Sequence, residues 1–287
     1  MKDLPIDMRP RWGFNFIREA VISFCVAVGC LFNQSAEAID NLRIPDLRTL
    51  SLGGSPTETP LFNPSLLAFQ TDSRLYVNYY NRYSVSELAT VSGGCYYINN
   101  VIPVGFEITS FGYDEYRESM FRLSLGKQLA ERWALGVALQ YCLLQSELFE
   151  ESSGRITSDI GLTYKATDEV MLALSMLHLP SMQVGDKNID NEHIAAYSFL
   201  FGLKWDITSV AMVTGSVEHC KETPLAGSFG FEYMPFDDFG IRAGLRTSPL
   251  RPSLGIGYRL GEIKADIGIL YHSVLGVSMG VGLSYSF

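Results

Sequence analysis

The chain has 287 residues, enough for one large domain, and its composition is 47% hydrophobic with a formal net charge of −9. This acidic balance argues against nucleic acid as a partner, because phosphate binding needs clustered lysine and arginine side chains. Two of the five cysteines fall near the N-terminus, and the other three, Cys95, Cys142 and Cys220, are an odd number at wide spacings. They predict neither a disulfide framework nor a zinc site.

Residues 1–38 are predicted to be a secretory signal peptide. Basic residues precede an apolar core over 20–32, and a small-residue cleavage site ends at Ala38. The core is shorter than the roughly 20 residues that a membrane-spanning helix needs, so we expect an export signal and not an anchor. Lipid attachment at Cys30 is an alternative, although Ala27 fits such a site poorly.

Residues 39–73 show no sustained periodicity and contain two short motifs. The first is Gly53-Gly54, which follows a leucine-rich stretch, and the second is Asn63-Pro64-Ser65. By themselves, an asparagine and a proline in sequence begin turns or cap helices, so a purely local role is one interpretation of the second motif.

Together, the two motifs resemble the segment before the first strand in the PorV/PorQ family of outer-membrane β-barrels, which is related to the FadL-like barrels. Further short motifs at 79–83, 105–107 and 111–116 are most similar to the PorQ branch. Ser65 stands where alanine is commoner. The resemblance implies that residues 39–73 fold into the barrel mouth as a plug.

Alternation of apolar with small or polar residues predicts an all-β domain over 74–287. Successive side chains of a strand point to opposite faces, so each such strand has one apolar face. The expected strands are 74–83, 89–99, 101–111, 119–128, 133–145, 156–166, 170–179, 196–205, 209–218, 226–234, 239–247, 252–260, 263–272 and 275–287. Their connections alternate between short and longer, as periplasmic turns and outer loops do. We therefore predict a single transmembrane antiparallel barrel of about 14 strands, although a soluble sandwich would also alternate.

The final strand, 275–287, has an apolar residue at every odd position and glycine or serine at every even position. It resembles the closing strand of bacterial outer-membrane barrels. By that resemblance Leu283, Tyr285 and Phe287 form the signal that the barrel-insertion machinery reads. The apolar face is expected to contact outer-membrane lipid, and the small residues leave room inside for residues 39–73 or for a ligand.

Charged residues on the opposite face are expected to line the lumen. They include Glu232, Arg242, Arg246, Arg259 and Asp266. One hypothesis is that the three arginines form an anion-attracting wall. The alternative, which we favour, is that they pair with Glu232, Asp266 and carboxylates of the plug, because buried charges are normally partnered.

No nucleophile, phosphate-loop or zinc-protease motif occurs, so the chain is predicted not to be an enzyme, and no cofactor or metal is expected. The resemblance implies an accessory or cargo-handling component of type IX protein secretion or surface assembly. Its partners would be secretion-system proteins or cargo. The resemblance also implies the outer membrane of a Gram-negative bacterium of the Bacteroidota.

A FadL-like channel for uptake of hydrophobic small molecules is the alternative function. Such channels resemble this chain in strand number and use a kinked third strand as a side exit. Pro103 lies in the expected third strand, where a missing ladder hydrogen bond would permit a lateral kink. Pro103 beginning the strand after a turn is the interpretation that we favour.

Overall fold

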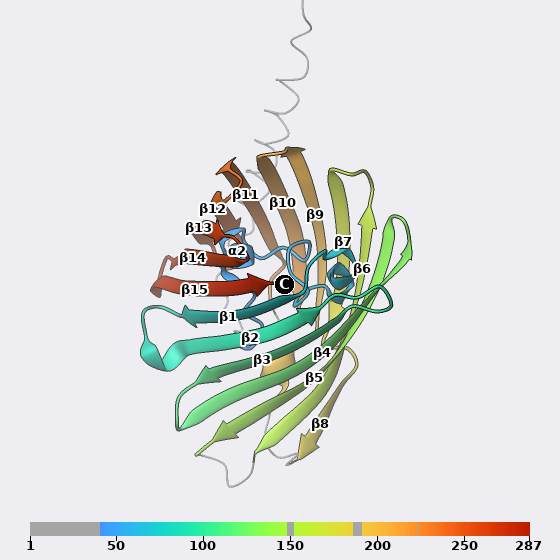
Figure 1. Cartoon of the computed structure of the whole chain (residues 1–287). Helices are drawn as coiled ribbons and strands as arrows, with labels where there is room; N and C mark the ends of the chain where they lie inside the picture. Colours follow the sequence, from blue (N-terminus) through green and yellow to red (C-terminus); the bar gives the residue numbers. More distant parts are fainter. Residues whose placement is uncertain (1–40, 148–151, 186–190, 222) are drawn as a thin grey trace, which may run out of the picture. The chain divides into compact units, whose positions relative to one another are not determined.

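The computed structural model describes residues 41–147, 152–185, 191–221 and 223–287, so the predicted signal peptide lies outside the described residues. These residues form fifteen strands in one antiparallel sheet that closes on itself (Figure 1). The strands are β1 (Arg74–Asn81), β2 (Ala89–Tyr97), β3 (Val104–Gly112), β4 (Tyr116–Ala130), β5 (Trp133–Ser146), β6 (Ser153–Lys165), β7 (Val170–Leu177), β8 (Ser181–Gly185), β9 (Ser198–Thr208), β10 (Ala211–Cys220), β11 (Ala226–Phe236), β12 (Phe239–Arg246), β13 (Arg251–Leu260), β14 (Ile263–His272) and β15 (Gly276–Ser286). Apart from β8, which pairs with β6, each strand pairs with the strand before it and the strand after it in the chain, with β7 followed by β9, and β1 pairs with β15 to complete the ring.

The wall has fourteen strand positions, because β7 and β8 lie one after the other along the same edge of β6. The all-β, antiparallel barrel of fourteen strands that the alternation predicts is therefore confirmed. The last strand shows the alternation. Gly280 and Gly282 face the lumen, whereas the adjacent residues Met279 and Val281 lie on the outer face and are 49% and 43% exposed.

The strand expected at 170–179 is interrupted in the structure. His178 has a φ of 59°, in the left-handed region that L-residues seldom adopt, and Pro180 has no N–H to give to a ladder. β6 spans the interruption by pairing with β7 on one side of it and with β8 on the other. Part of the outer loop expected at 180–195 is consequently a strand.

Apolar side chains form a belt on the outer surface of the barrel. In β11, for example, Phe229 and Phe231 are 44% and 38% exposed, whereas Glu232 is 5% exposed on the inner face. A belt of this kind on every side is far larger than the apolar patches of soluble monomers. Reversing the faces would place charges in hydrocarbon at about 2–4 kcal/mol each near the midplane. The chain is accordingly an outer-membrane β-barrel that crosses the bilayer with its strands.

The two ends of the barrel differ in their connections. At one end the Phe287 N–H donates to the Ser73 carbonyl at 2.9 Å, and the connections are short, such as 131–132 and 261–262. We call it the periplasmic end. The opposite, outer end has the longer connections, including 186–197 between β8 and β9. This is the distribution expected of bacterial barrels.

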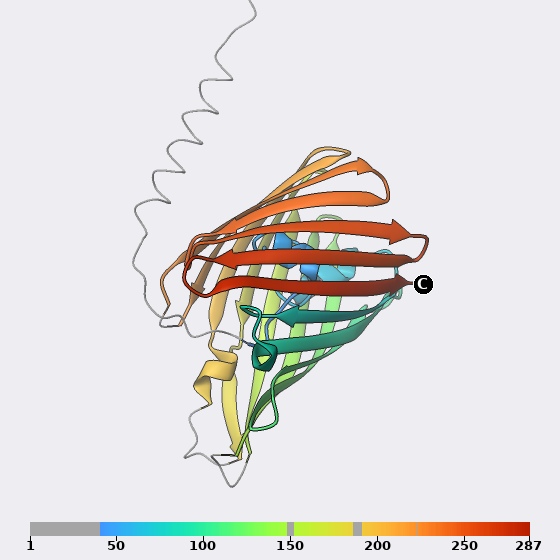
Figure 2. The same ribbon diagram turned by 90° about the vertical axis from the view of Figure 1, so that its left-hand side faces the viewer.

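Residues 41–73, which we call the inner segment, pack against the inward faces of the strands. The segment contains the helix α2 (Leu47–Ser51), which contacts β12 to β15, and the 3-10 helix η1 (Pro64–Phe69), which contacts β4 to β6. Figure 2 shows the blue segment between the red C-terminal strands and the green strands. Two further 3-10 helices, η2 (Ser86–Leu88) and η3 (Glu192–Ala195), lie at the outer end. None of the helices within the described ranges is long and apolar enough to cross a membrane.

Glycines of the wall give the inner segment its room. A side-chain carbon added at Gly126 of β4 would lie 2.8 Å from Leu67 Cβ and 3.0 Å from the Ala68 nitrogen. Such a carbon could not be accommodated unless η1 moved away from the wall. The small residues predicted to leave space inside the barrel therefore receive the backbone of the inner segment.

Candidate functional site

The Asn63-Pro64-Ser65 motif caps η1 and also attaches it to the wall. Asn63 Oδ1 accepts hydrogen bonds from the Ser65 N–H at 3.1 Å and from Ser65 Oγ at 2.6 Å. On its other side, Asn63 Nδ2 donates to Thr163 Oγ1 on β6 at 3.0 Å. Pro64 occupies the first turn, where its missing N–H costs nothing. The local capping role weighed from the dipeptide is therefore present, together with a contact to β6.

The Gly53-Gly54 motif ends the turn after α2. Both residues have positive φ values, 83° and 86°, which glycine adopts without steric cost. An added side-chain carbon at Gly53 would also lie 3.1 Å from two wall carbonyls, those of Phe229 and Leu245. The motif thus lets the chain reverse direction close to the barrel wall.

Two pockets lie inside the barrel, one on either side of the first residues of the inner segment. The outer pocket encloses about 140 Å³ and is lined at the outer end by residues such as Arg82 and His272. The periplasmic pocket encloses about 70 Å³ and includes Arg74 at the periplasmic end. Ile44 and Pro45 line both pockets, so this dipeptide separates them.

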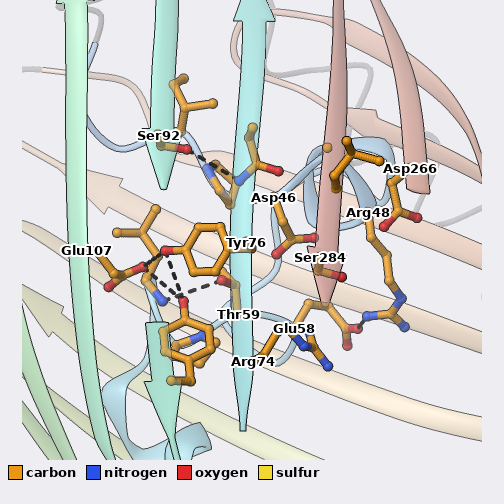
Figure 3. A pocket seen from close by; sticks show the side chains of 18 of the residues that line it. Asp46, Arg48, Glu58, Thr59, Arg74, Tyr76, Ser92, Glu107, Asp266 and Ser284 are labelled. Carbon is orange, nitrogen blue, oxygen red and sulfur yellow. Dashed lines mark hydrogen bonds and ion pairs between the residues drawn. The ribbon is translucent and has the colours of Figure 1, made fainter. Parts of the chain in front are cut away.

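The periplasmic pocket is polar (Figure 3). Tyr76 and Tyr96 donate their hydroxyls to Glu107 Oε1 at 2.6 and 2.9 Å. Behind the glutamate, the fully buried Arg122 pairs with both Glu107 and Asp159. Each of the two carboxylates thereby contacts Arg122, and this side of the pocket presents the tyrosine hydroxyl groups.

On the other side of the periplasmic pocket, charges of the wall meet those of the inner segment. Arg48 of α2 pairs with Glu58 at 2.5 Å and with Glu232 at 2.6 Å, and Figure 3 shows it beside Asp266. Arg242 bridges Glu232 and Asp266, both at 2.5 Å. Burial would lower the pKa of the Arg48 guanidinium, but Glu58 and Glu232 outweigh burial and hold that pKa above its ordinary value. Arg48 therefore remains charged.

The predicted lumen charges do not form one wall. Arg242, Glu232 and Asp266 come together, whereas Arg246 lies at the outer end and pairs with Glu218 at 2.8 Å. Arg259 is exposed at the periplasmic end of β13. Arg242 and Arg246 have carboxylate partners, as in the paired alternative. The sequence analysis did not single out Arg43 and Arg48. They are the two basic residues of 41–73, and a basic residue in a segment expected inside the barrel indicates a carboxylate partner on the wall.

The outer pocket combines an apolar interior with arginines. Ile44, Leu50, Phe62, Tyr80 and Leu270 supply apolar surface from the inner segment, β1 and β14. Tyr80 and Leu270 are nearly completely buried and pack in one cluster with Ile44. The pocket is consequently a partly apolar cavity that opens beneath the outer loops.

Pro103 and the predicted insertion signal lie away from both pockets. Pro103 immediately precedes β3, and β3 pairs without a register shift with β2 and with β4, so no lateral kink occurs in this strand. A proline needs no N–H partner at such a position, which explains why it can stand directly before the strand without bending it. Leu283, Tyr285 and Phe287 are about half exposed on the outer surface. Within the described ranges, no group of three or more acidic, histidine or cysteine side chains could hold a metal ion.

No protein-family model matches this sequence, and no curated protein matches it by sequence similarity. Solved structures do match in fold. One crystal structure of the Pseudomonas putida toluene transporter TodX has a TM-score of 0.61 and 11% identity, and the match covers 85% of this chain and 98% of that one. A Pseudomonas aeruginosa FadL homologue has a TM-score of 0.57 and 12% identity, covering 86% of this chain and 99% of the homologue.

The fold is therefore similar to that of FadL-like outer-membrane barrels. At identities of 11% and 12%, the similarity shows the fold alone. None of the comparisons points to the PorV/PorQ family in particular, so the secretion role stays a prediction from short sequence motifs.

Proposed function

We propose that this chain is an outer-membrane channel for the uptake of hydrophobic small molecules, with the outer pocket as the capture site. The observation that carries the proposal is the partly apolar cavity within the lumen, beneath the outer loops, lined by Phe62, Tyr80 and Leu270. Concave apolar sites with a few polar groups are the usual binding sites for small molecules. The toluene transporter similar to this chain in fold is a precedent for such a function on this architecture.

We also propose that the inner segment acts as the plug of this channel. A solute leaving the outer pocket toward the periplasm meets Ile44 and Pro45, which separate the two pockets. Polar contacts at the start of the segment hold this dipeptide: Asn41 donates to Glu118 at 2.7 Å, and Arg43 donates to Ser198 at 2.6 Å. Passage would require these contacts to open while α2 and η1 stay packed against the wall.

Filling the outer pocket tests the capture site. Leu270→Trp enlarges a side chain that is 7% exposed on the inner face, and Ile269→Trp makes the same kind of change at a neighbour that is 48% exposed on the lipid face. Uptake of radiolabelled toluene would be measured in cells of a strain without hydrocarbon channels of its own. We expect Leu270→Trp to abolish most uptake and Ile269→Trp to retain it. Equal uptake by wild type, by Leu270→Trp and by cells lacking the protein would contradict the proposal.

The accessory role in secretion is a second candidate, favoured by a strand edge at the outer end. Among the described residues, β8 forms a ladder with β6 and with no second strand. An edge of this kind can accept an extended segment of another protein. Co-purification from outer membranes in mild detergent tests this role. Recovery of a large protein that is lost when Val184 is replaced by proline would support it, and recovery of lipid alone would count against it.

A further inference from the structure

Tyr80 has a closely packed ring in an apolar part of the barrel interior. It lies on the inner face of β1 and is 4% exposed. Its ring packs in one cluster with Ile44, Leu47 and Leu270. A side-chain carbon added at Gly280, the partner of Tyr80 on β15, would lie 3.2 Å from the ring carbon Cδ2. The wall therefore holds the ring closely and fixes the position of its hydroxyl.

The Tyr80 hydroxyl has no hydrogen-bond partner within the part of the chain that the structure describes, and the side chains clustered around its ring are hydrocarbons. Some unpartnered side-chain oxygens, such as Thr214 Oγ1, are sealed from solvent by the protein, but the Tyr80 oxygen is not among them. Because Tyr80 lines the outer pocket, its hydroxyl is open to that cavity. A tyrosine hydroxyl can both donate and accept a hydrogen bond.

The serine hydroxyls of the outer pocket, in contrast, have partners in the protein. Ser253 Oγ donates to the Ser51 carbonyl at 3.0 Å, and Ser278 Oγ accepts from the Tyr83 N–H at 3.0 Å. The fold thus uses these two hydroxyls and leaves that of Tyr80 without a partner. A hydroxyl in an apolar setting without a hydrogen bond is unfavourable, and a phenyl ring would pack in the same cluster without that cost. A bound group that pairs with the hydroxyl would remove the cost.

The size of the outer pocket is suited to a single aromatic ring. Its volume of about 140 Å³ is close to that of an engineered apolar cavity, about 150 Å³, that binds benzene. Leu50, Phe62 and Leu270 supply apolar surface for such a ring. A pure hydrocarbon would fill this space, but it would remove water from the Tyr80 hydroxyl without offering a hydrogen bond in return. A ring that carries one neutral hydroxyl satisfies both parts of the site.

We propose that the ligand of the outer pocket is a monocyclic phenol, with its ring against Phe62 and Leu270 and its hydroxyl bonded to the Tyr80 hydroxyl. This inference rests on the proposed uptake function and names the substrate class. Both hydroxyls can donate and accept, so one hydrogen bond between them gives each a partner away from water. The ligand then differs by its hydroxyl group from toluene, the compound named for the transporter of similar fold.

Calorimetric titration of the purified full-length protein in detergent tests the inference with p-cresol and toluene, which differ only by the hydroxyl, and protein-free detergent is the blank. Tyr80→Phe removes the tyrosine hydroxyl and keeps the ring. We expect the ratio of p-cresol affinity to toluene affinity to fall about tenfold in this variant, because the ligand hydroxyl is then buried without a partner. Tyr79→Phe, at the neighbour that is 42% exposed on the lipid face, should keep the wild-type ratio. The same ratio in Tyr80→Phe as in the wild type would overturn the inference.

Urea unfolding of the ligand-free protein in lipid vesicles separates a binding role of the hydroxyl from a structural one. A hydroxyl without a partner in the fold can be removed without loss, so we expect Tyr80→Phe to unfold at the wild-type urea concentration or above it. A lower midpoint would overturn the inference. Failure of the proposed function gives a different pattern. If Leu270→Trp abolishes toluene uptake but the affinity ratio does not depend on Tyr80, only the phenol inference falls. If uptake is independent of the pocket and neither ligand binds, both fall.

Discussion

Replacing Gly126 by valine should expel η1 from the barrel wall. The new Cβ would lie 2.8 Å from Leu67 Cβ and 3.0 Å from two backbone atoms, the Pro64 oxygen and the Ala68 nitrogen. β4 is held by ladders on both edges, so the inner segment must yield and not the strand. Overpacking of this kind costs about 1–3 kcal/mol. That cost shifts the equilibrium between the packed and displaced segment by a factor of about 5–150.

The assay is the conductance of single barrels in planar lipid bilayers, because a displaced inner segment leaves a wider water-filled lumen. We expect Gly126→Val to open more often, or to a higher conductance, than the wild-type protein. Gly215→Val is the matched control, since a side-chain carbon there meets no atom nearer than 3.9 Å. A folded Gly126→Val barrel that conducts as the wild type does would refute the plug role and the packing argument behind it.

Two further predictions concern the stability of the wall and are checked by urea unfolding of the barrel in lipid vesicles. Arg122→Met leaves Glu107 and Asp159 buried without their cation, and we expect a loss of about 3–5 kcal/mol in the free energy of unfolding; an unchanged unfolding midpoint would contradict the stabilising role of this buried ion pair. Ile267→Lys, in the middle of the lipid face of β14, should cost about 2–4 kcal/mol, whereas Ile263→Lys at the end of that strand should cost about 0–1 kcal/mol. Equal costs at the two positions would contradict the lipid orientation of the belt.

The amino-acid sequence predicts the barrel because its evidence is local. Side-chain direction alternates along a strand whatever the strand pairs with, so the two faces of β15 can be derived from 275–287 alone. Connection lengths are likewise visible in the sequence, and they separate the periplasmic end from the outer end. The expected strands and the described ones differ mainly in length, as at β4, which extends from Tyr116 to Ala130 and not over 119–128.

The interruption between β7 and β8 shows where local evidence ends. Met171 to Leu179 is apolar on both faces, so the alternation gives no phase there. The break at His178 and Pro180 depends on the backbone of β6, which continues past it and pairs with the chain on both sides. The sequence of a single strand does not indicate which distant residues it pairs with in a ladder.

The candidate site depends on long-range contacts to a greater degree. Arg48 pairs with Glu232, which lies 184 residues later in the sequence, and Arg43 contacts Glu218 across 175 residues. Closure of the barrel decides which charged side chains come within a few ångströms of one another. The Coulomb interaction between two such charges depends on their distance and on their burial. The sequence alone thus determines a lipid-facing barrel with a polar interior. The tertiary structure alone decides that Arg242 is compensated at the periplasmic pocket and that four arginines converge on the outer pocket.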